Sequence, residues 1–298
     1  MTELGIEVWR GGVNPWQCDQ MGHLNVRFYV AHATEALAGL AAGLGMSRAY
    51  APGAASTLVV REHHIRYLKE ARSGQPLHMT AGFLDVTGDG GRALQVLRHS
   101  LTDEPSALFQ TTLVHAAAAD AQPFAWSAAQ REKAESLRIV LPDGMGPRSL
   151  VLGESPPRAV PEKAFRHGLG AFAPEDCDVF GRVRADRIMT RLAEGAFYST
   201  ALTRQAVGEA IGMAVVEYRL TYLEWPRAGD RVEVRSGWTS VEARRLRSSH
   251  WVMEPGGKRI WALAEAVVLP FDLEARKALT MPDEAVAALR ARMIPGLA

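Results

Sequence analysis

Hydrophobic and polar positions alternate along several stretches of the chain. Residues 5–13 carry alternating apolar side chains and end at Asn14-Pro15, which indicates a strand followed by a turn. Residues 28–44 are rich in Ala and Leu and are apolar around much of a helical circumference, which predicts a buried helix. Turn clusters separate four further strand patterns, at residues 57–68, 77–86, 93–101 and 107–116. The order predicts an antiparallel sheet wrapped around one helix, an α+β fold.

The second half of the chain repeats this series of elements. The segment from Cys18 to Asn25 aligns with the segment from Cys177 to Arg184 at an offset of 159 (177 minus 18), and Cys, Asp and Gly match. Residues 62–68 resemble residues 217–223 at an offset of 155 (217 minus 62). A helix near 185–206 and strands near 213–223, 231–241, 246–253 and 260–269 complete the second copy. Matching blocks in one order indicate a duplication. The alternative is one large α+β domain with accidental similarity.

The repeat suggests where the domains begin and end. We expect residues 1–120 to form the first domain and residues 162–298 the second. Between them, residues 121–161 contain several prolines and one short helical pattern near 127–137, which is typical of a linker. The pattern at 282–293 predicts a last helix on the surface.

Composition narrows the classes of function. The 298 residues include 34 Lys and Arg against 33 Asp and Glu, so no overall basic field favours nucleic acid or an anionic membrane. The longest apolar stretches are shorter than the roughly 20 residues that cross a bilayer, and the N-terminus lacks a secretory pattern. Two cysteines are too few for a disulfide scaffold or a metal framework. We therefore expect a cytoplasmic protein without membrane or nucleic-acid partners.

A short motif precedes the predicted helix of the first copy. It consists of Asp19-x-x-Gly22-His23-x-Asn25, with Tyr29 ten residues after the Asp. This arrangement resembles the motif of hot-dog-fold acyl-CoA thioesterases, the relatives of 4-hydroxybenzoyl-CoA thioesterase. The resemblance implies two tandem hot-dog domains, each an antiparallel sheet around a central helix, that form an intramolecular pseudo-dimer. It also implies that Gly22 and Tyr29 lie beside the substrate.

Hydrolysis of a thioester needs a carboxylate that activates water or attacks the carbonyl carbon. It also needs a donor for the negative charge that develops on oxygen. The resemblance assigns the carboxylate to Asp19 and the donor to the backbone N–H of Val26, where the helix begins. His23 and Asn25 are expected to orient the loop or the thioester.

Some of these residues also have structural interpretations. Asp19 can cap its loop by accepting backbone N–H groups, and His23 can be a hydrogen-bonded turn histidine. Glu35 is a second candidate for the catalytic carboxylate, because some hot-dog thioesterases use a helix carboxylate. An acidic group on a buried apolar helix is expected to be either functional or paired with a cation.

In the second copy Asp178 and Gly181 remain, while Arg182 and Arg184 replace the His and the Asn. Two positive charges beside a carboxylate lower its basicity. We therefore expect one competent site built around the first copy, with Asp178 and Arg182 contacting substrate in a pocket that is degenerate or adapted to an anionic group. The alternative is two active sites with different substrates.

The resemblance implies an acyl-CoA thioesterase that needs no cofactor. There are two alternatives: an enoyl-CoA hydratase or dehydratase, and a protein that binds acyl-CoA without turnover. No metal is expected, because His63 and His64 are neighbours on a predicted strand and point to opposite faces. The substrate can be carried by CoA or by acyl carrier protein, which share the pantetheine arm, and a homo-oligomer remains possible.

Overall fold

A computed structural model describes residues 4–153, 157–195, 201, 211–272 and 277–294. The chain divides into two compact units. The first unit comprises Met1–Pro147 together with Cys177–Asp186, and the second comprises Arg148–Asp176 and Arg187–Ala298. A loop from the second copy therefore belongs to the first unit.

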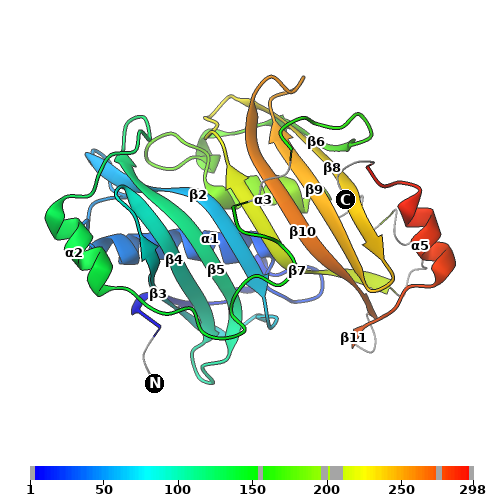
Figure 1. Cartoon of the computed structure of the whole chain (residues 1–298), viewed down its shortest axis with the longest axis horizontal. Coiled ribbons are helices and arrows are strands. Elements are labelled where there is room, and N and C mark those ends of the chain that lie inside the picture. Colours follow the sequence, from blue (N-terminus) through cyan, green and yellow to red (C-terminus); the bar gives the residue numbers. More distant parts are fainter. Residues whose placement is uncertain (1–3, 154–156, 196–200, 202–210, 273–276, 295–298) are drawn as a thin grey trace. The chain divides into compact units, whose positions relative to one another are not determined.

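The first unit is an antiparallel sheet with one long helix against it, α1 (Val26–Gly43) (Figure 1). The strand order is β1-β3-β4-β5-β2. The strands are β1 (Ile6–Gly12), β2 (Ser56–Tyr67), β3 (Pro76–Val86), β4 (Gly90–His99) and β5 (Pro105–Ala117). The observed bounds confirm the predicted helix and strands to within a few residues.

Small residues and one buried amide hold α1 against this sheet. Gly39 lies so close to β1 that an added Cβ would stand 2.4 Å from the carbonyl oxygen of Val8. From β4, the side chain of Gln95 donates to the carbonyl oxygen of Ala33 at 2.7 Å, and Thr111 donates to Gln95 at 2.7 Å. The helix is thus fixed both by close packing and by a buried hydrogen bond.

The second unit repeats the strand order of the first. Its strands run β7-β10-β9-β8-β6, which matches β2-β5-β4-β3-β1, and the short β11 pairs with β10. The strands are β6 (Phe165–Ala171), β7 (Ile211–Tyr222), β8 (Arg231–Glu242), β9 (Arg245–Met253), β10 (Ile260–Asp272) and β11 (Lys277–Ala278). The equal order is what a duplication predicts.

The remaining helices agree with the predictions where they are described. Helix α3 (Ala185–Ala193) begins where a helix at 185–206 is predicted, and positions 196–200 and 202–206 lie outside the described residues. Helix α2 (Ala128–Ser136) lies in the predicted linker. Helix α5 (Asp283–Arg290) packs against β8 and buries one apolar face. Among the helices that the structure describes, none has the length and apolarity that a bilayer crossing requires.

Candidate active site

The loop between β1 and α1 is a tight turn that its own aspartate closes. The N–H of Asp19 donates to the carbonyl oxygen of His23 at 2.8 Å, and the N–H of Gly22 donates to that of Asp19 at 3.0 Å. Gly22 has a φ of +76°, in the left-handed region that favours glycine. Asp19 Oδ1 accepts the N–H groups of Met21 at 2.8 Å and His23 at 3.1 Å. Asp19 therefore caps the loop, as one interpretation predicts, but uses only one of its two oxygens to do so.

The other oxygen of Asp19 is available for chemistry. Oδ2 has no hydrogen-bond partner in the part of the chain that the structure describes, and the residue is exposed to solvent. One oxygen fixes the carboxylate in place while the second faces solvent, so capping and catalysis are compatible for this side chain.

The start of α1 leaves one backbone donor unused. Asn25 is the N-cap, and its side chain accepts the N–H of Arg27 at 3.0 Å. The N–H of Phe28 donates to the carbonyl oxygen of Asn25 at 2.8 Å. The N–H of Val26, the first residue of the helix, has no acceptor among the described residues. This is the group to which the family resemblance assigns the role of oxyanion donor, and it lies at the positive end of the helix dipole.

His23 has a carboxylate neighbour that sequence reasoning missed. Its Nε2 lies 3.1 Å from Oε2 of Glu70, and its side chain is 13% exposed. Its backbone also pairs with Arg72 in an isolated bridge. Glu70 stands three residues after the end of β2, just beyond the block that the two copies share, so no motif marked it.

Tyr29 is part of the core. Its hydroxyl accepts the N–H of Ala71 at 3.0 Å, and its ring packs edge-on against Tyr67 at 5.2 Å between centroids. Burial raises the pKa of Tyr29 to about 12. These contacts connect α1 to Ala71 and Tyr67, and the place of Tyr29 beside the substrate stays a prediction.

Glu35 is not buried, contrary to the expectation from the sequence. Its side chain is 67% exposed, so the premise that it is buried on an apolar helix is wrong. The helix buries the face that carries Val30, Ala33 and Leu37, and position 35 falls on the opposite stripe. Oε2 accepts the indole N–H of Trp9 at 2.8 Å. Oε2 also lies 3.9 Å from Nδ1 of His32, and a carboxylate that is largely in solvent needs no further partner to explain it.

The loop of the second copy has the same backbone hydrogen bonds as the first. Asp178 N donates to the carbonyl oxygen of Arg182 at 2.7 Å, and Gly181 N donates to that of Asp178 at 3.0 Å. Asp178 Oδ1 accepts the N–H groups of Phe180 at 2.8 Å and Arg182 at 3.0 Å. Gly181 has a φ of +75°. The Asp-x-x-Gly pattern thus encodes one loop conformation in both copies.

The two arginines of this loop pair with different carboxylates. Arg182 Nε lies 3.4 Å from Oδ2 of Asp178. Arg184 Nε lies 3.0 Å from Oδ1 of Asp186, which is 3% exposed, and Arg27 Nε lies 3.6 Å from the other oxygen of Asp186. Of the two positive charges that we expect beside Asp178, Arg182 pairs with it, whereas Arg184 pairs with Asp186 instead.

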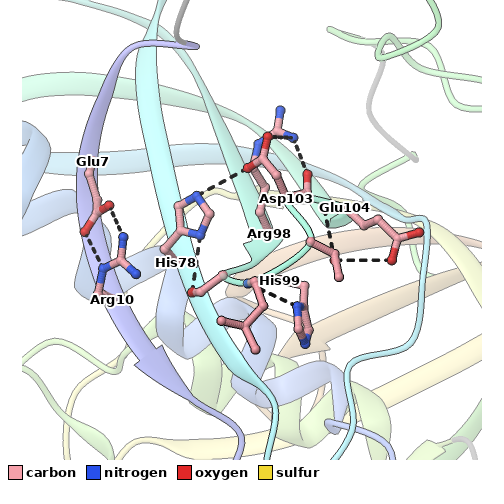
Figure 2. Close-up of polar contacts among 10 residues, drawn as sticks. Glu7, Arg10, His78, Arg98, His99, Asp103 and Glu104 are labelled. Carbon is pink, nitrogen blue, oxygen red and sulfur yellow. Dashed lines mark hydrogen bonds and ion pairs between the residues drawn. The ribbon is translucent and has the colours of Figure 1, made fainter.

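A second polar cluster lies on β1, β3, β4 and the turn after β4 (Figure 2). His78 and Arg98 both contact Asp103, at 3.6 and 3.5 Å. Nearby, a cavity of about 140 Å³ is lined by Lys69, Glu70, Gln75, His99, Thr102, Glu104 and Ser106. Glu70 connects this cavity to His23 of the loop. Its lining is polar, so it does not suit an acyl chain.

The structure offers no metal centre in the residues it describes, where no group of three or more His, Cys, Asp or Glu side chains is placed to hold an ion. His63 is fully buried on β2, and burial lowers its pKa to about 3.

Known structures share this fold. A structure described as an oleoyl thioesterase from Lactobacillus plantarum superposes with a TM-score of 0.71 at 11% identity, covering 94% of this chain and 99% of that one. An acyl-ACP thioesterase from Bacteroides thetaiotaomicron gives 0.65 at 11% identity, covering 87% and 96%. A 12:0-ACP thioesterase from Umbellularia californica gives 0.64 at 13% identity, covering 90% and 94%. A search of curated proteins gave no match.

The sequence also matches a family model in both copies. The model of the thioesterase-like superfamily aligns with residues 13–134 and again with residues 172–289, so it covers more than half of the chain. Both aligned segments contain the Asp-x-x-Gly loop and the strands that follow it. The chain therefore belongs to the thioesterase-like superfamily, as a tandem hot-dog thioester hydrolase.

Proposed function

We propose that this hydrolase cleaves an acyl thioester of CoA or of acyl carrier protein at the loop of its first copy. One observation supports this: the loop-to-helix segment carries both an Oδ2 of Asp19 and an N–H of Val26 that have no hydrogen-bond partner among the described residues. A carboxylate and an oxyanion donor are the two groups that the reaction requires.

In the proposed reaction, water adds to the carbonyl carbon as its proton passes to the Asp19 carboxylate. Negative charge moves to the carbonyl oxygen, where the N–H of Val26 stabilises it. When the tetrahedral intermediate collapses, the C–S bond breaks and the departing thiolate takes up the proton. Alternatively, Asp19 attacks first and water then hydrolyses the mixed anhydride. Both routes yield a carboxylic acid and a thiol.

The neighbouring side chains would keep these groups in position. His23, held near Glu70, and Asn25, which caps α1, fix the two ends of the turn around Asp19 and Val26. The proposed site also includes Gly22, whose left-handed conformation sets the direction of the loop. Small errors in such positions reduce rates strongly, because attack requires close alignment.

The carrier of the acyl group is part of the proposal. Two of the similar structures are named as ACP thioesterases, which supports a substrate bound to acyl carrier protein. Acyl-CoA is the substrate that the motif resemblance implies. Because both carriers end in pantetheine, a site that contacts only the thioester and this arm would accept either. Release of free thiol from acyl-CoA and acyl-ACP panels of increasing chain length would identify the carrier and the preferred acyl group.

Replacing Asp19 tests the proposal directly. In Asp19→Asn the side-chain oxygen still caps the loop, but the base is lost, so we expect kcat to fall by about 100-fold or more. Asp103→Asn is the matched control, because Asp103 is an exposed turn residue at a φ of +58°, which Asn tolerates. Equal turnover in Asp19→Asn and wild type would contradict this assignment. Loss of conjugation in crotonyl-CoA would instead indicate a hydratase.

A further inference from the structure

Position 182 in the second copy occupies the place that His23 holds in the first. In the first copy Glu70 supplies a carboxylate to that position, at 3.1 Å. The offset of 155 that aligns residues 62–68 with 217–223 places Trp225 at the position of Glu70 (225 minus 70). The second copy therefore has a stronger cation at this position of the loop and lacks the corresponding carboxylate.

The guanidinium of Arg182 is buried without full satisfaction of its donors. Its side chain is 8% exposed, it lies over the ring of Phe180 at 4.8 Å, and its Nε is 3.4 Å from Asp178. Its Nη1 is buried and has no hydrogen-bond partner within the described ranges. A buried charged donor without an acceptor costs more than a neutral one, so this atom indicates a missing acceptor.

The charges of Arg182, Asp178 and Arg61 do not cancel. Burial lowers the pKa of Arg61, and the positive charge of Arg182 lowers it further, so the two guanidinium groups repel each other. The carboxylate that pairs with Arg182, that of Asp178, already accepts two backbone N–H groups. The hydroxyl of Tyr50 donates to the carbonyl oxygen of Leu58 and stays neutral, because burial raises its pKa. Arg61, Arg182 and Asp178, taken together, leave one positive charge.

We propose that the loop of the second copy binds a carboxylate, through Nη1 of Arg182. One residual charge suits a monoanion, and the guanidinium fork matches the planar carboxylate group. Phosphate carries nearly two negative charges, which Asp178 would repel. If the chain hydrolyses acyl thioesters, as proposed above, this carboxylate is the free acid, so the second copy binds the class of compound that the first copy releases.

Calorimetry with octanoate and its neutral analogue octanamide tests this site in the full chain. The two probes share the apolar chain, so their difference reports the charge. We expect octanoate to bind wild type at least tenfold more tightly than octanamide, and Arg182→Met to abolish the difference. Arg182→Lys should retain part of it, and Asp178→Asn, which keeps the loop cap, should tighten octanoate binding. Arg98→Met is the control, since Arg98 is 14% exposed and keeps a carboxylate partner, Asp103.

The outcomes separate this inference from the proposed function. Octanoate binding that survives in Asp19→Asn and disappears in Arg182→Met supports a carboxylate site in the second copy. Octanoate binding that Arg182→Met leaves unchanged, or no preference over octanamide in wild type, overturns it. Inorganic phosphate bound as tightly as octanoate overturns the assignment to a carboxylate. Loss of turnover in Asp19→Asn tests only the first copy, so either proposal can fail alone.

Discussion

At the scale of single residues, the first N–H of α1 is the oxyanion donor that we propose. Val26 is the first helical residue, after an N-cap whose φ of −66° and ψ of 141° are extended. Proline is favoured at this helical position because it needs no N–H there, and the residue before a proline prefers extended backbone. The donor can therefore be removed with little disturbance of the helix.

We expect Val26→Pro to lower kcat by about 100-fold to 1,000-fold, the effect of losing one oxyanion donor. Val26→Ala keeps the N–H and should retain most activity. Steady-state thiol release would measure both, and circular dichroism would show whether α1 is intact. A Val26→Pro enzyme that is folded and fully active would exclude this N–H from the reaction.

At the scale of elements, the packing of α1 on its sheet is set by backbone contact. The carbonyl of Val8 on β1 approaches Gly39 so closely that no side chain fits, whereas an added Cβ at Gly43 would meet only side-chain ends, of Ile6 and Leu137. Side-chain ends can rotate away, and backbone cannot. Gly39 and Gly43 thus differ in whether a Cβ atom can be added at their positions.

Gly39→Ala is therefore expected to destabilise the protein by about 1 to 3 kcal/mol, as overpacking does. For Gly43→Ala we expect a change of less than about 1 kcal/mol, because the better helix propensity of Ala offsets the small displacement. Urea denaturation of both variants would give the two values. Equal effects would show that helix propensity, and not the contact with Val8, decides.

At the scale of the whole molecule, buried histidines link stability to pH, and the pKa is lowered most in three of them. Burial lowers the pKa of His63 to about 3, that of His167 to about 4, and that of His250, also opposed by the charge of His167, to about 3. In the second unit, Ser236 joins His167 at 2.7 Å and His250 at 2.6 Å. These rings remain neutral in the folded chain at pH values that protonate them once unfolded.

Above pH about 6.5 the histidines are neutral in both states and add no pH dependence. As pH falls below that value, the unfolded chain binds protons that the folded chain excludes, so each histidine lowers stability by about 1.4 kcal/mol per pH unit. We expect the urea midpoint to fall steadily from pH 6.5 to 5. His250→Gln introduces at position 250 the residue that the first copy has at position 95 (250 minus 95 is 155). Because this variant takes up one proton fewer on unfolding, its stability should depend on pH less steeply, by about 1.4 kcal/mol per pH unit. An unchanged slope would contradict the assignment.

Most of the fold was predictable because its signals are local. Alternating side chains marked the strands, Ala-rich residues marked α1, and the Asp-x-x-Gly pattern marked a turn whose glycines, Gly22 and Gly181, need a positive φ. The repeat was visible because the same local signals occur twice. The exposure of Glu35 was missed because helical periodicity alone did not indicate which stripe of α1 faces the sheet.

The amino-acid sequence by itself determined the duplicated α+β architecture, the position of the loop and the chemical types of its residues, because each depends on neighbours along the chain. Only the tertiary structure decided which partners those residues have. Glu70 beside His23, Ala71 on the hydroxyl of Tyr29, and the buried Nη1 of Arg182 all result from the packing of separate segments. Such contacts depend on how distant segments pack, and the periodicity of apolar residues along the sequence does not encode this packing.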